Sequence, residues 1–472
     1  MESFECIAKT FHGLEELLAQ ELTDLGADKV RTLKRAVSFQ GDLEMLYRAN
    51  LHCRTAVRIL KTAYSFPAKD ETELYEKVSD IPWEDFLQLG QTFAIDSTVF
   101  SESFKHSKYA SLKMKDAIVD RFKKKSGRRP DVDTRNPDLQ LNLHISHERV
   151  NIGLDSSGET LNRRGYRASG HVAPLNEVLA AGMVMLSGWD KEQTFYDPMC
   201  GSGTLPIEAA MMACRIPPGF HRKHFGFMDW PDYDEEIWKN LIKEAEGRMD
   251  LEADVDIRGS EMKGLYVRMA KSAAKAVGLH GRIRFFQGDF FEQSMKDSMI
   301  MMNPPYGERI GHRYITDFYA DIADHLKQSF TGSTVWILSS NEEALKYFGL
   351  RPSRRIRLFN GPLECSFQKF ELNKGTKKVH KLSDDYRKPY GKGERREFKD
   401  KGKHRTDRGR EDSRSYDRSR NTSRIRRTDS SFKEERPRNT RPERPSEPRH
   451  PSDYDPSRDK RSRGPKDESG DR

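Results

Sequence analysis

Several features that would place this 472-residue chain in a membrane or outside a cell are missing from its sequence. It contains no apolar run approaching about 18 residues, so we expect no membrane span. Its first residues, MESFE, show neither the basic start nor the apolar core of a signal peptide. These absences favour a cytoplasmic location.

Cysteine is also scarce, and none of the cysteines forms a C-x-x-C pair. The residues are Cys6, Cys53, Cys200, Cys214 and Cys365. Without paired spacing they argue against a zinc site and for reduced thiols in a cytosol. We therefore expect no bound metal.

Apolar residues almost disappear in the last hundred positions, 373–472, where nine remain. This segment holds 33 Lys and Arg against 20 Asp and Glu, a net charge of +13, whereas residues 1–372 carry −4 of the overall +9. A segment so poor in apolar side chains cannot bury a core, and we predict a disordered basic tail. Its arginines and scattered tyrosines suit sequence-tolerant RNA contact, with a purely solubilising role as the alternative.

The most informative motif that is present reads Asn303-Pro304-Pro305-Tyr306 and follows the apolar run MIMM, which has the length of a buried strand. The Asn303 side-chain oxygen and the Pro304 carbonyl can each accept one hydrogen of an exocyclic amine. Tyr306 can stack on the ring that carries this amine. Standing alone, the motif would more often be an ordinary turn, by about two to one. Its neighbours favour a socket for a planar amine.

A glycine-rich turn, DPMCGSGT, runs from Asp197 to Thr204 between a short strand and an apolar helix. Glycines at Gly201 and Gly203 let backbone approach a ligand closely. The following helix N-terminus favours electron-rich or anionic groups. The turn lacks the Gly-Lys-Ser/Thr signature of a phosphate loop, and its Gly-x-Gly-x-x-Pro spacing differs from the dinucleotide fingerprint.

Two further predicted strands end close to acidic residues, Glu261 and Asp289. An acid at the tip of the second strand suits bidentate hydrogen bonding to a ribose diol. Asp289 could accept a hydrogen bond from an adenine amine, and Phe290 could cover the adenine ring. Strands and helices alternate here, which implies a parallel α/β sheet that binds ligands at the carboxyl ends of its strands.

In this order and spacing, DPMCGSGT, GSE, GDFF and NPPYGER resemble motifs of class I S-adenosylmethionine-dependent amino-methyltransferases. The segment LNRRGYR, followed by APLNE, is similar to the entry motif of THUMP-domain RNA methyltransferases. The match is to the RlmL-like bacterial enzymes that make N2-methylguanosine in 23S ribosomal RNA. It covers roughly residues 1–372. The resemblance implies a Rossmann-like class I methyltransferase domain, S-adenosyl-L-methionine as cofactor and RNA as partner.

The resemblance also implies roles for individual residues. The cofactor-binding residues would be Ala173, Pro174, Leu175, Asp197, Gly201, Gly203, Thr204, Glu261, Asp289 and Phe290. The residues that orient the target amine would be Asn303, Pro304, Pro305 and Tyr306. A sulfonium methyl is already an activated electrophile, so orientation is the main catalytic resource and we assign no general base.

The first 160 residues read as a separate α+β unit. Alternating apolar residues predict strands at 4–9, 37–41, 54–60, 91–96, 139–145 and 149–154. Helical spacing predicts helices at 13–25, 43–50, 71–78 and 111–124. The resemblance implies a ferredoxin-like subdomain at 1–50, a THUMP RNA-binding domain at 51–160 and the methyltransferase domain at 161–372, which the tail at 373–472, predicted from composition, follows. A basic strip at 107–129 fits phosphate contact or a solvated helix end.

The resemblance favours transfer to the exocyclic N2 amine of a guanosine in 23S ribosomal RNA, and transfer RNA remains an alternative target. A DNA adenine or protein glutamine methyltransferase would also use NPPY, but the THUMP-like first half argues against both. A non-catalytic RNA-binding ribosome-assembly factor could keep the same fold. The intact Gly201, Gly203, Glu261, Asp289 and Asn303 argue against that reading.

Deleting residues 373–472 tests the role of the tail. We expect a folded protein that binds RNA more weakly and with a shallower salt dependence, because phosphate contacts by Lys and Arg are lost. RNA affinity measured over a series of salt concentrations gives this slope. A full-length variant with the tail arginines replaced by glutamine is the matched control and should behave like the deletion. An unchanged slope in both variants would contradict the role.

Overall fold

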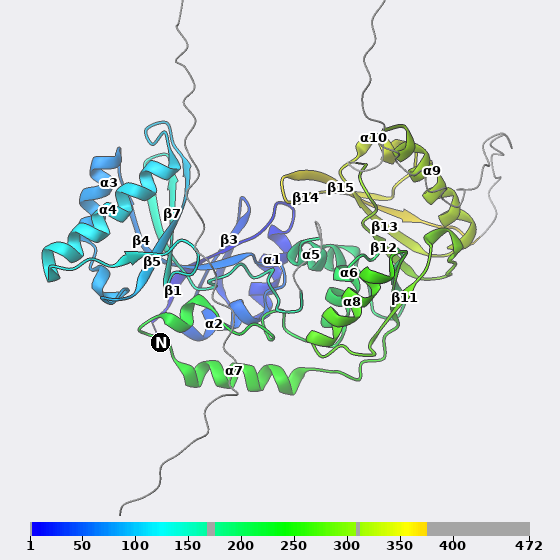
Figure 1. Ribbon diagram of the computed structural model, residues 1–472, viewed down its shortest axis with the longest axis horizontal. Helices are drawn as coiled ribbons and strands as arrows, with labels where there is room; N and C mark the ends of the chain where they lie inside the picture. Colours follow the sequence, from blue (N-terminus) through cyan, green and yellow to red (C-terminus); the bar gives the residue numbers. More distant parts are fainter. Residues whose placement is uncertain (1, 168–174, 308–311, 375–472) are drawn as a thin grey trace, which may run out of the picture. The chain divides into compact units, whose positions relative to one another are not determined.

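Two β-sheets organise the part of the chain that the computed structural model describes, which comprises residues 2–167, 175–307 and 312–374 (Figure 1). These residues all belong to one compact unit, Met1–Ser383. From position 375 onward, the predicted tail lies outside the described residues. None of the helices in the described ranges is long and apolar enough to cross a membrane.

The first sheet contains β1 to β8 in the order β2-β3-β1-β4-β8-β7-β5-β6. Its strands are β1 (Phe4–Lys9), β2 (Asp28–Leu33), β3 (Ala36–Gly41), β4 (Arg58–Pro67), β5 (Thr92–Phe100), β6 (Asp131–Val132), β7 (Leu139–Ser146) and β8 (Arg149–Asp155). The helices beside it are α1 (Glu15–Asp24), α2 (Leu43–His52), α3 (Glu71–Asp80) and α4 (Ser107–Ser126). Strand β5 runs parallel to its neighbours, and the other pairs are antiparallel.

The second sheet has the order β11-β10-β9-β12-β13-β15-β14. Its strands are β9 (Phe195–Asp197), β10 (Ile257–Glu261), β11 (Ile283–Gln287), β12 (Met299–Met302), β13 (Thr334–Ser339), β14 (Arg354–Asn360) and β15 (Leu363–Glu371). The helices around it are α5 (Glu177–Ser187), α6 (Thr204–Ala213), α7 (Glu235–Arg248), α8 (Gly264–Ala276), α9 (His312–Ser329) and α10 (Glu342–Lys346). Strands β9 to β13 run parallel, and the hairpin β14–β15 adds antiparallel strands at one edge.

Apolar composition explains why β12 lies in the middle of this sheet. All four residues of β12 are buried, because both faces of a parallel sheet are covered by helices. On β9, Phe195 joins one core cluster with residues of α5, α6 and α8, whereas Tyr196 joins another with residues of α9 and α10. The predicted parallel α/β sheet is thereby confirmed.

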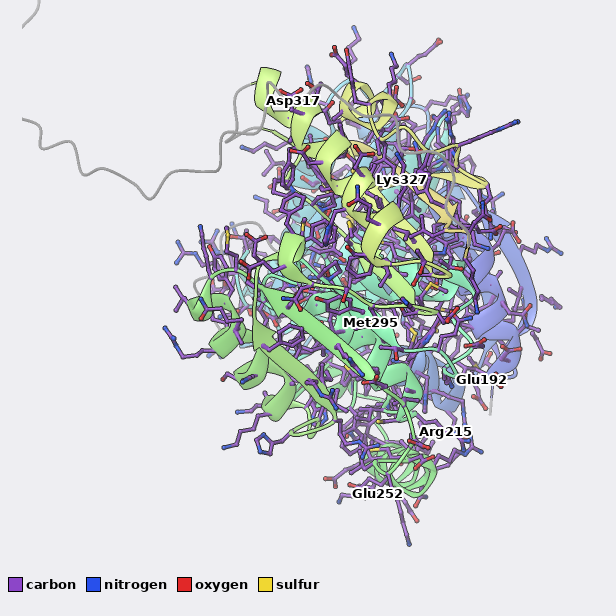
Figure 2. All side chains as sticks on the ribbon, turned by 90° about the vertical axis from the view of Figure 1, so that its right-hand side faces the viewer. Glu192, Arg215, Glu252, Met295, Asp317 and Lys327 are labelled. Carbon is purple, nitrogen blue, oxygen red and sulfur yellow. The ribbon has the colours of Figure 1, made fainter. Side chains whose placement is uncertain are left out.

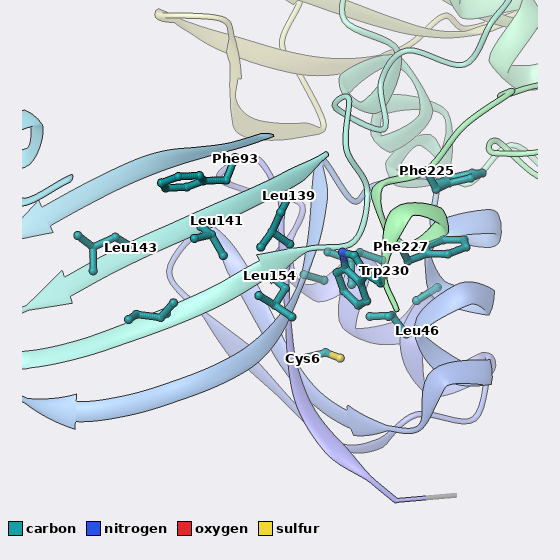
Figure 3. Close-up of a cluster of buried hydrophobic side chains, with 14 of the residues drawn as sticks. Cys6, Leu46, Phe93, Leu139, Leu141, Leu143, Leu154, Phe225, Phe227 and Trp230 are labelled. Atoms are coloured by element: carbon teal, nitrogen blue, oxygen red, sulfur yellow. The ribbon is translucent and has the colours of Figure 1, made fainter. Parts of the chain in front are cut away.

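The segment between α6 and α7 packs against the first sheet instead of its own. Phe225, Phe227 and Trp230 belong to the core cluster of the N-terminal unit (Figure 3). Tyr47 of α2 stacks on Phe227 with 4.2 Å between ring centroids, and its hydroxyl accepts a hydrogen bond from the Asp234 amide at 3.1 Å. This aromatic contact brings the α6–α7 connection into the apolar core of the first sheet.

The strand predicted at 54–60 begins only at Arg58, so the prediction was wrong for its first residues. The backbone amides of Arg54 and Thr55 donate to the Glu21 carboxylate at 2.7 and 3.0 Å. A side chain distant in sequence therefore satisfies this backbone in place of a neighbouring strand. Further on, β4 pairs with both β1 and β8, so one continuous sheet crosses the expected boundary at residue 50.

A buried arginine on the segment before α5 contacts both parts of the unit. The Arg164 side chain is 1 % exposed, and its Nε pairs with Glu208 Oε1 of α6 at 3.3 Å. Its Nη2 donates to the Arg54 carbonyl at 2.6 Å, and Tyr166 donates its hydroxyl to the same Glu208 oxygen at 2.9 Å. Helix α6 is thereby fixed to the N-terminal unit through polar contacts.

Replacing Arg164 by alanine should destabilise the protein by about 3–5 kcal/mol, because the buried Glu208 carboxylate would lose its cation. The adjacent Arg163 is the matched control: it pairs with Glu159, and both side chains are 68 % exposed. Arg163→Ala should cost less than about 1 kcal/mol. Denaturant unfolding of the two variants compares them, and equal losses of stability would refute the assignment of a buried ion pair.

Candidate functional site

The glycine-rich turn follows β9 and leads directly into α6. The Cys200 amide donates to the Ser260 carbonyl at 3.0 Å, which anchors the turn to β10. Gly201 and Gly203 have φ values of +53° and +83°, in the left-handed region that favours glycine. A Cβ at Gly203 would lie 2.8 Å from the Phe285 ring, so packing requires glycine there as well. Thr204 is the first residue of α6 and is buried.

Two carboxylates meet beside this turn. Asp197, at the end of β9, is 2 % exposed and accepts a hydrogen bond from the Met199 amide at 3.0 Å. Glu261, at the end of β10, accepts from the Gly201 amide at 3.3 Å and from the Lys263 amide at 3.0 Å. Burial raises the pKa of Asp197 to about 8; the Met199 amide opposes this shift, and the Glu261 charge adds to it.

This electrostatic arrangement suits a ligand that carries a positive charge. The Asp197 carboxylate is buried, and the charged group that shifts its pKa is another carboxylate. A buried charge of this kind is stabilised when a cation lies beside it. An ammonium or sulfonium group would supply that cation, and the remaining lone pairs of Glu261 could accept from a diol. The two carboxylates therefore fit the amino-acid and ribose parts of S-adenosylmethionine.

Asp289, the third predicted acidic residue, makes a local hydrogen bond, whereas the neighbouring Phe290 is buried. Asp289 follows β11 and caps a short turn by accepting from the Phe291 amide at 3.0 Å. Phe290 is only 4 % exposed, with its ring stacked against Phe330 at 5.7 Å between centroids. The ring therefore lies within a core cluster, and a role in covering adenine remains a prediction.

Sequence reasoning did not single out Met262, which directly follows Glu261 and is 61 % exposed. An exposed thioether beside the acid predicted to bind a diol can lie against a flat ring. Phe291, at 39 % exposed, offers a second apolar surface next to Asp289. The signal in the sequence was an apolar residue close behind each acid, one position after Glu261 and two positions after Asp289.

Arg167 is a second residue that sequence reasoning left without a role. Its Nη2 donates to the Leu175 carbonyl at 2.7 Å and to Thr204 Oγ1 at 3.2 Å, and its Nε pairs with Glu177 at 3.1 Å. Through these contacts Arg167 holds Leu175, which is 7 % exposed, at the first turn of α6. The other two predicted cover residues, Ala173 and Pro174, lie outside the described residues.

The NPPY motif follows β12 directly, as predicted. Tyr306 donates its hydroxyl to Asn303 Oδ1, and its own backbone carbonyl accepts from Asn341 Nδ2 at 3.0 Å. The Tyr319 hydroxyl of α9 donates to the Pro305 carbonyl at 3.3 Å. Pro304 is buried and Pro305 is exposed. These contacts fix the turn from two sides.

The register of the parallel strands brings the predicted residues to one edge of the sheet. Strand β9 lies between β10 and β12, so Asp197, Glu261 and Asn303 all follow the carboxyl ends of neighbouring strands. Figure 2 views the side where α9 carries Asp317 and Lys327, with Met295 of the β11–β12 connection beneath them. In the described part of the chain, no group of three or more His, Cys, Asp or Glu could hold a metal ion.

The second sheet and its helices define a class I methyltransferase fold, which here follows an α+β unit. Family models match an RlmL ferredoxin-like domain at residues 5–60, a THUMP domain at 68–155 and an RMKL-like methyltransferase domain at 164–369. A putative RNA methyltransferase of Synechocystis, slr0064, is 37 % identical over 77 % of this chain and 96 % of its own length. The chain therefore belongs to the RMKL-like methyltransferase family with ferredoxin-like and THUMP domains, which confirms the predicted resemblance.

Two further comparisons concern a longer relative and a solved structure. Ribosomal RNA large subunit methyltransferase K/L of Syntrophotalea carbinolica is 37 % identical over 76 % of this chain, and the chain spans about half, 52 %, of that relative's length. The crystal structure of SMU.472, a putative methyltransferase complexed with SAH, matches with a TM-score of 0.71 and 28 % identity. That match covers 80 % of this chain and 100 % of the other chain.

The raised pKa of Asp197 predicts proton release when S-adenosylhomocysteine binds. A cationic ligand stabilises the ionised carboxylate, so affinity should fall several-fold as the pH is lowered from about 8 to about 6. Without ligand, the stability that this group contributes is present below its ordinary pKa of 3.8 and is lost as the pH rises towards about 8. Calorimetry in two buffers of different ionisation enthalpy measures the released proton. Release that persists in Asp197→Asn would exclude this carboxyl as its source.

Proposed function

We propose that this protein is an S-adenosylmethionine-dependent RNA methyltransferase that acts on the exocyclic N2 amine of a guanosine in 23S ribosomal RNA. The observation that carries the proposal is the meeting of Asp197, Glu261 and Asn303 at one edge of the parallel sheet. The two carboxylates suit the charged and diol parts of the cofactor, and Asn303 begins a socket for a planar amine. The proposed place of action is the cytoplasm.

The residues of the socket contribute orientation. The cofactor supplies an activated methyl group, and the amine of guanine is a weak nucleophile because its lone pair is delocalised into the ring. Asn303 Oδ1 and the Pro304 carbonyl accept the two amine hydrogens and aim the lone pair at the methyl group. Holding the two reactants in line is therefore the main contribution of the socket. No base has to remove a proton before the transfer, because the proton can leave afterwards.

The N-terminal unit supports RNA as the substrate. A THUMP domain stands in front of the methyltransferase domain, and the K/L relatives are named for ribosomal RNA. Helix α4 presents Tyr109, which is 47 % exposed, with Lys113 Nζ lying 5.6 Å from its ring centroid. Three exposed lysines at 123–125 extend this basic strip. A cationic strip with an exposed ring suits phosphates and unstacked bases.

Asn303→Ala should abolish methyl transfer while leaving affinity for S-adenosylhomocysteine within about twofold, because the amide orients the amine and not the cofactor. Asn240→Ala, an exposed position on α7, is the matched control and should keep wild-type transfer. Labelled cofactor offered with ribosomal RNA, transfer RNA and DNA, followed by nucleoside digestion, identifies the product.

The three nucleic acids offered as substrates distinguish the candidate functions. N2-methylguanosine in 23S ribosomal RNA supports the proposal, and the same product in transfer RNA alone would move the target to that RNA. Wild-type turnover by Asn303→Ala would remove the proposed socket. Cofactor binding without transfer to any nucleic acid would instead favour a non-catalytic RNA-binding role.

A further inference from the structure

Two short segments concentrate positive charge at positions that the site described above does not use. Residues 28–35 form β2 and the turn to β3, and they hold four basic residues and one acid. Residues 351–357 lead into β14 and hold four arginines and no acid. The basic residues are Lys29, Arg31, Lys34, Arg35, Arg351, Arg354, Arg355 and Arg357, and all of them are exposed. This concentration contrasts with the net charge of −4 over residues 1–372.

The loop between β1 and α1 contacts both segments. Glu15 accepts hydrogen bonds from the Gly13 amide at 2.6 Å and from the Arg35 amide at 3.0 Å. Gly13 lies directly against β14, because a Cβ at this position would be 2.7 Å from the Arg357 carbonyl oxygen. Beside it, the His12 ring meets the Phe359 ring edge-on with 5.6 Å between centroids. The turn at Arg35 and strand β14 are therefore parts of one surface, with a pair of rings at their junction.

Most of these cations have no carboxylate beside them. Within the described residues, Arg357 is the only one of the eight that forms an ion pair; its Nε lies 3.1 Å from Glu364 Oε1, and both side chains are more than half exposed. Strand β14 is an edge strand, and Arg355 shares one of its faces with Arg357, because alternate residues of a strand point the same way. Exposed cations without partners attract a polyanion.

The backbone of Arg35 indicates that folding does not require an arginine there. Its φ of +58° lies in the left-handed region, which is unfavourable for any residue with a Cβ. The Glu15 carboxylate accepts from its amide, and its carbonyl accepts from the Thr10 amide at 3.0 Å, so the backbone alone fixes the turn. Glycine would adopt this conformation without strain. A strained residue with an exposed charged side chain points to a role in binding.

The same hairpin also packs near the NPPY turn. Strands β14 and β15 supply Leu358 and Cys365 to the core cluster against which Tyr306 packs. Ile356, which stands between Arg355 and Arg357 in the chain, packs against this cluster as well. The arginines of β14 therefore lie on the element that supports the proposed socket.

We propose that residues 29–35 and 351–357 form one RNA-binding surface, which holds the phosphate backbone of the substrate RNA beside the NPPY turn. The inference rests on the proposed function, because it takes RNA as the substrate. It adds a contact separate from the basic strip on α4, and this contact joins the ferredoxin-like domain to the edge strand of the methyltransferase sheet. Phosphate contacts position a nucleic acid without reading its sequence, so the choice of amine stays with the socket.

Arg355→Gln combined with Arg357→Gln removes two charges from β14. The affinity of the full-length protein for 23S ribosomal RNA, measured without cofactor, should fall about tenfold, because two phosphate contacts are lost. The slope of log affinity against log salt concentration should become shallower by about 1 to 2. Lys239→Gln combined with Lys243→Gln, an exposed pair on α7, is the matched control and should keep the wild-type affinity and slope.

Turnover of the β14 double variant gives a second measurement. A phosphate contact binds the substrate and the transition state equally, so KM for RNA should rise while kcat stays near the wild-type value. Affinity for S-adenosylhomocysteine should be unchanged. A loss of packing around Tyr306 would instead lower kcat, and wild-type KM in this variant would contradict the proposal.

Arg35→Gly tests the other segment, because it removes a charge and relieves the strained backbone together. RNA affinity should fall about threefold although the melting temperature is not lowered, a combination that a purely structural role would not produce. Should the melting temperature fall, Arg31→Gln, which leaves the turn backbone unchanged, decides in its place. Wild-type RNA affinity and salt slope in either segment's variant would overturn the proposal of a single surface.

The failure of this surface and the failure of the proposed function give different results. Wild-type turnover by Asn303→Ala, or no methylation of an RNA amine by the wild type, removes the proposed function. Methylation of RNA by the wild type, together with unchanged RNA binding and KM in the surface variants, removes only the surface. The binding measurements require no methyl transfer, so they test the surface independently of the socket.

Discussion

The site depends on one electrostatic constraint, a buried carboxylate at the end of β9, an interior strand of the sheet. Asp197 cannot move away from the sheet, because β9 lies between β10 and β12 and its Oδ1 is bonded to the Met199 amide. A second carboxylate, Glu261, stands beside it on the next strand. Burying negative charge in this way is unfavourable without a cation. The methyl donor of the family carries a positive charge. The buried carboxylate that destabilises the free protein therefore favours the bound state.

The N-terminal unit is joined to this site by polar as well as apolar contacts. Arg164 and Glu208 connect α6, whose first turn borders the glycine-rich loop, to the backbone around Arg54. The aromatic segment around Phe227 fills the core of the first sheet. A rigid connection of this kind would let the proposed RNA-binding strip on α4 set the distance between a bound RNA and the NPPY turn. Under the proposed function that distance matters, because a target base would have to leave its stack to reach the NPPY turn.

Sequence reasoning recovered the motifs that sit at strand ends. The turn at 197–204 and the NPPY motif at 303–306 each combine glycine or proline with a buried strand, and these local signals survive without tertiary information. Periodicity failed at 54–57, where a distant carboxylate bonds the backbone. Periodicity also did not predict that the Phe290 ring is buried in a core cluster, because the sequence does not show which way an aromatic residue beside an acid faces.

The sequence by itself determined the fold class, the family and the order of the motifs, because apolar period, glycine spacing and proline placement act over a few residues at a time. Tertiary structure alone decided which of these motifs meet. Strand order places β9 between β10 and β12, and the β14–β15 hairpin supplies Leu358 and Cys365 to the core cluster against which Tyr306 packs. Such contacts depend on how strands pair and twist across the whole sheet, and pairing between distant segments leaves no periodic trace in the chain.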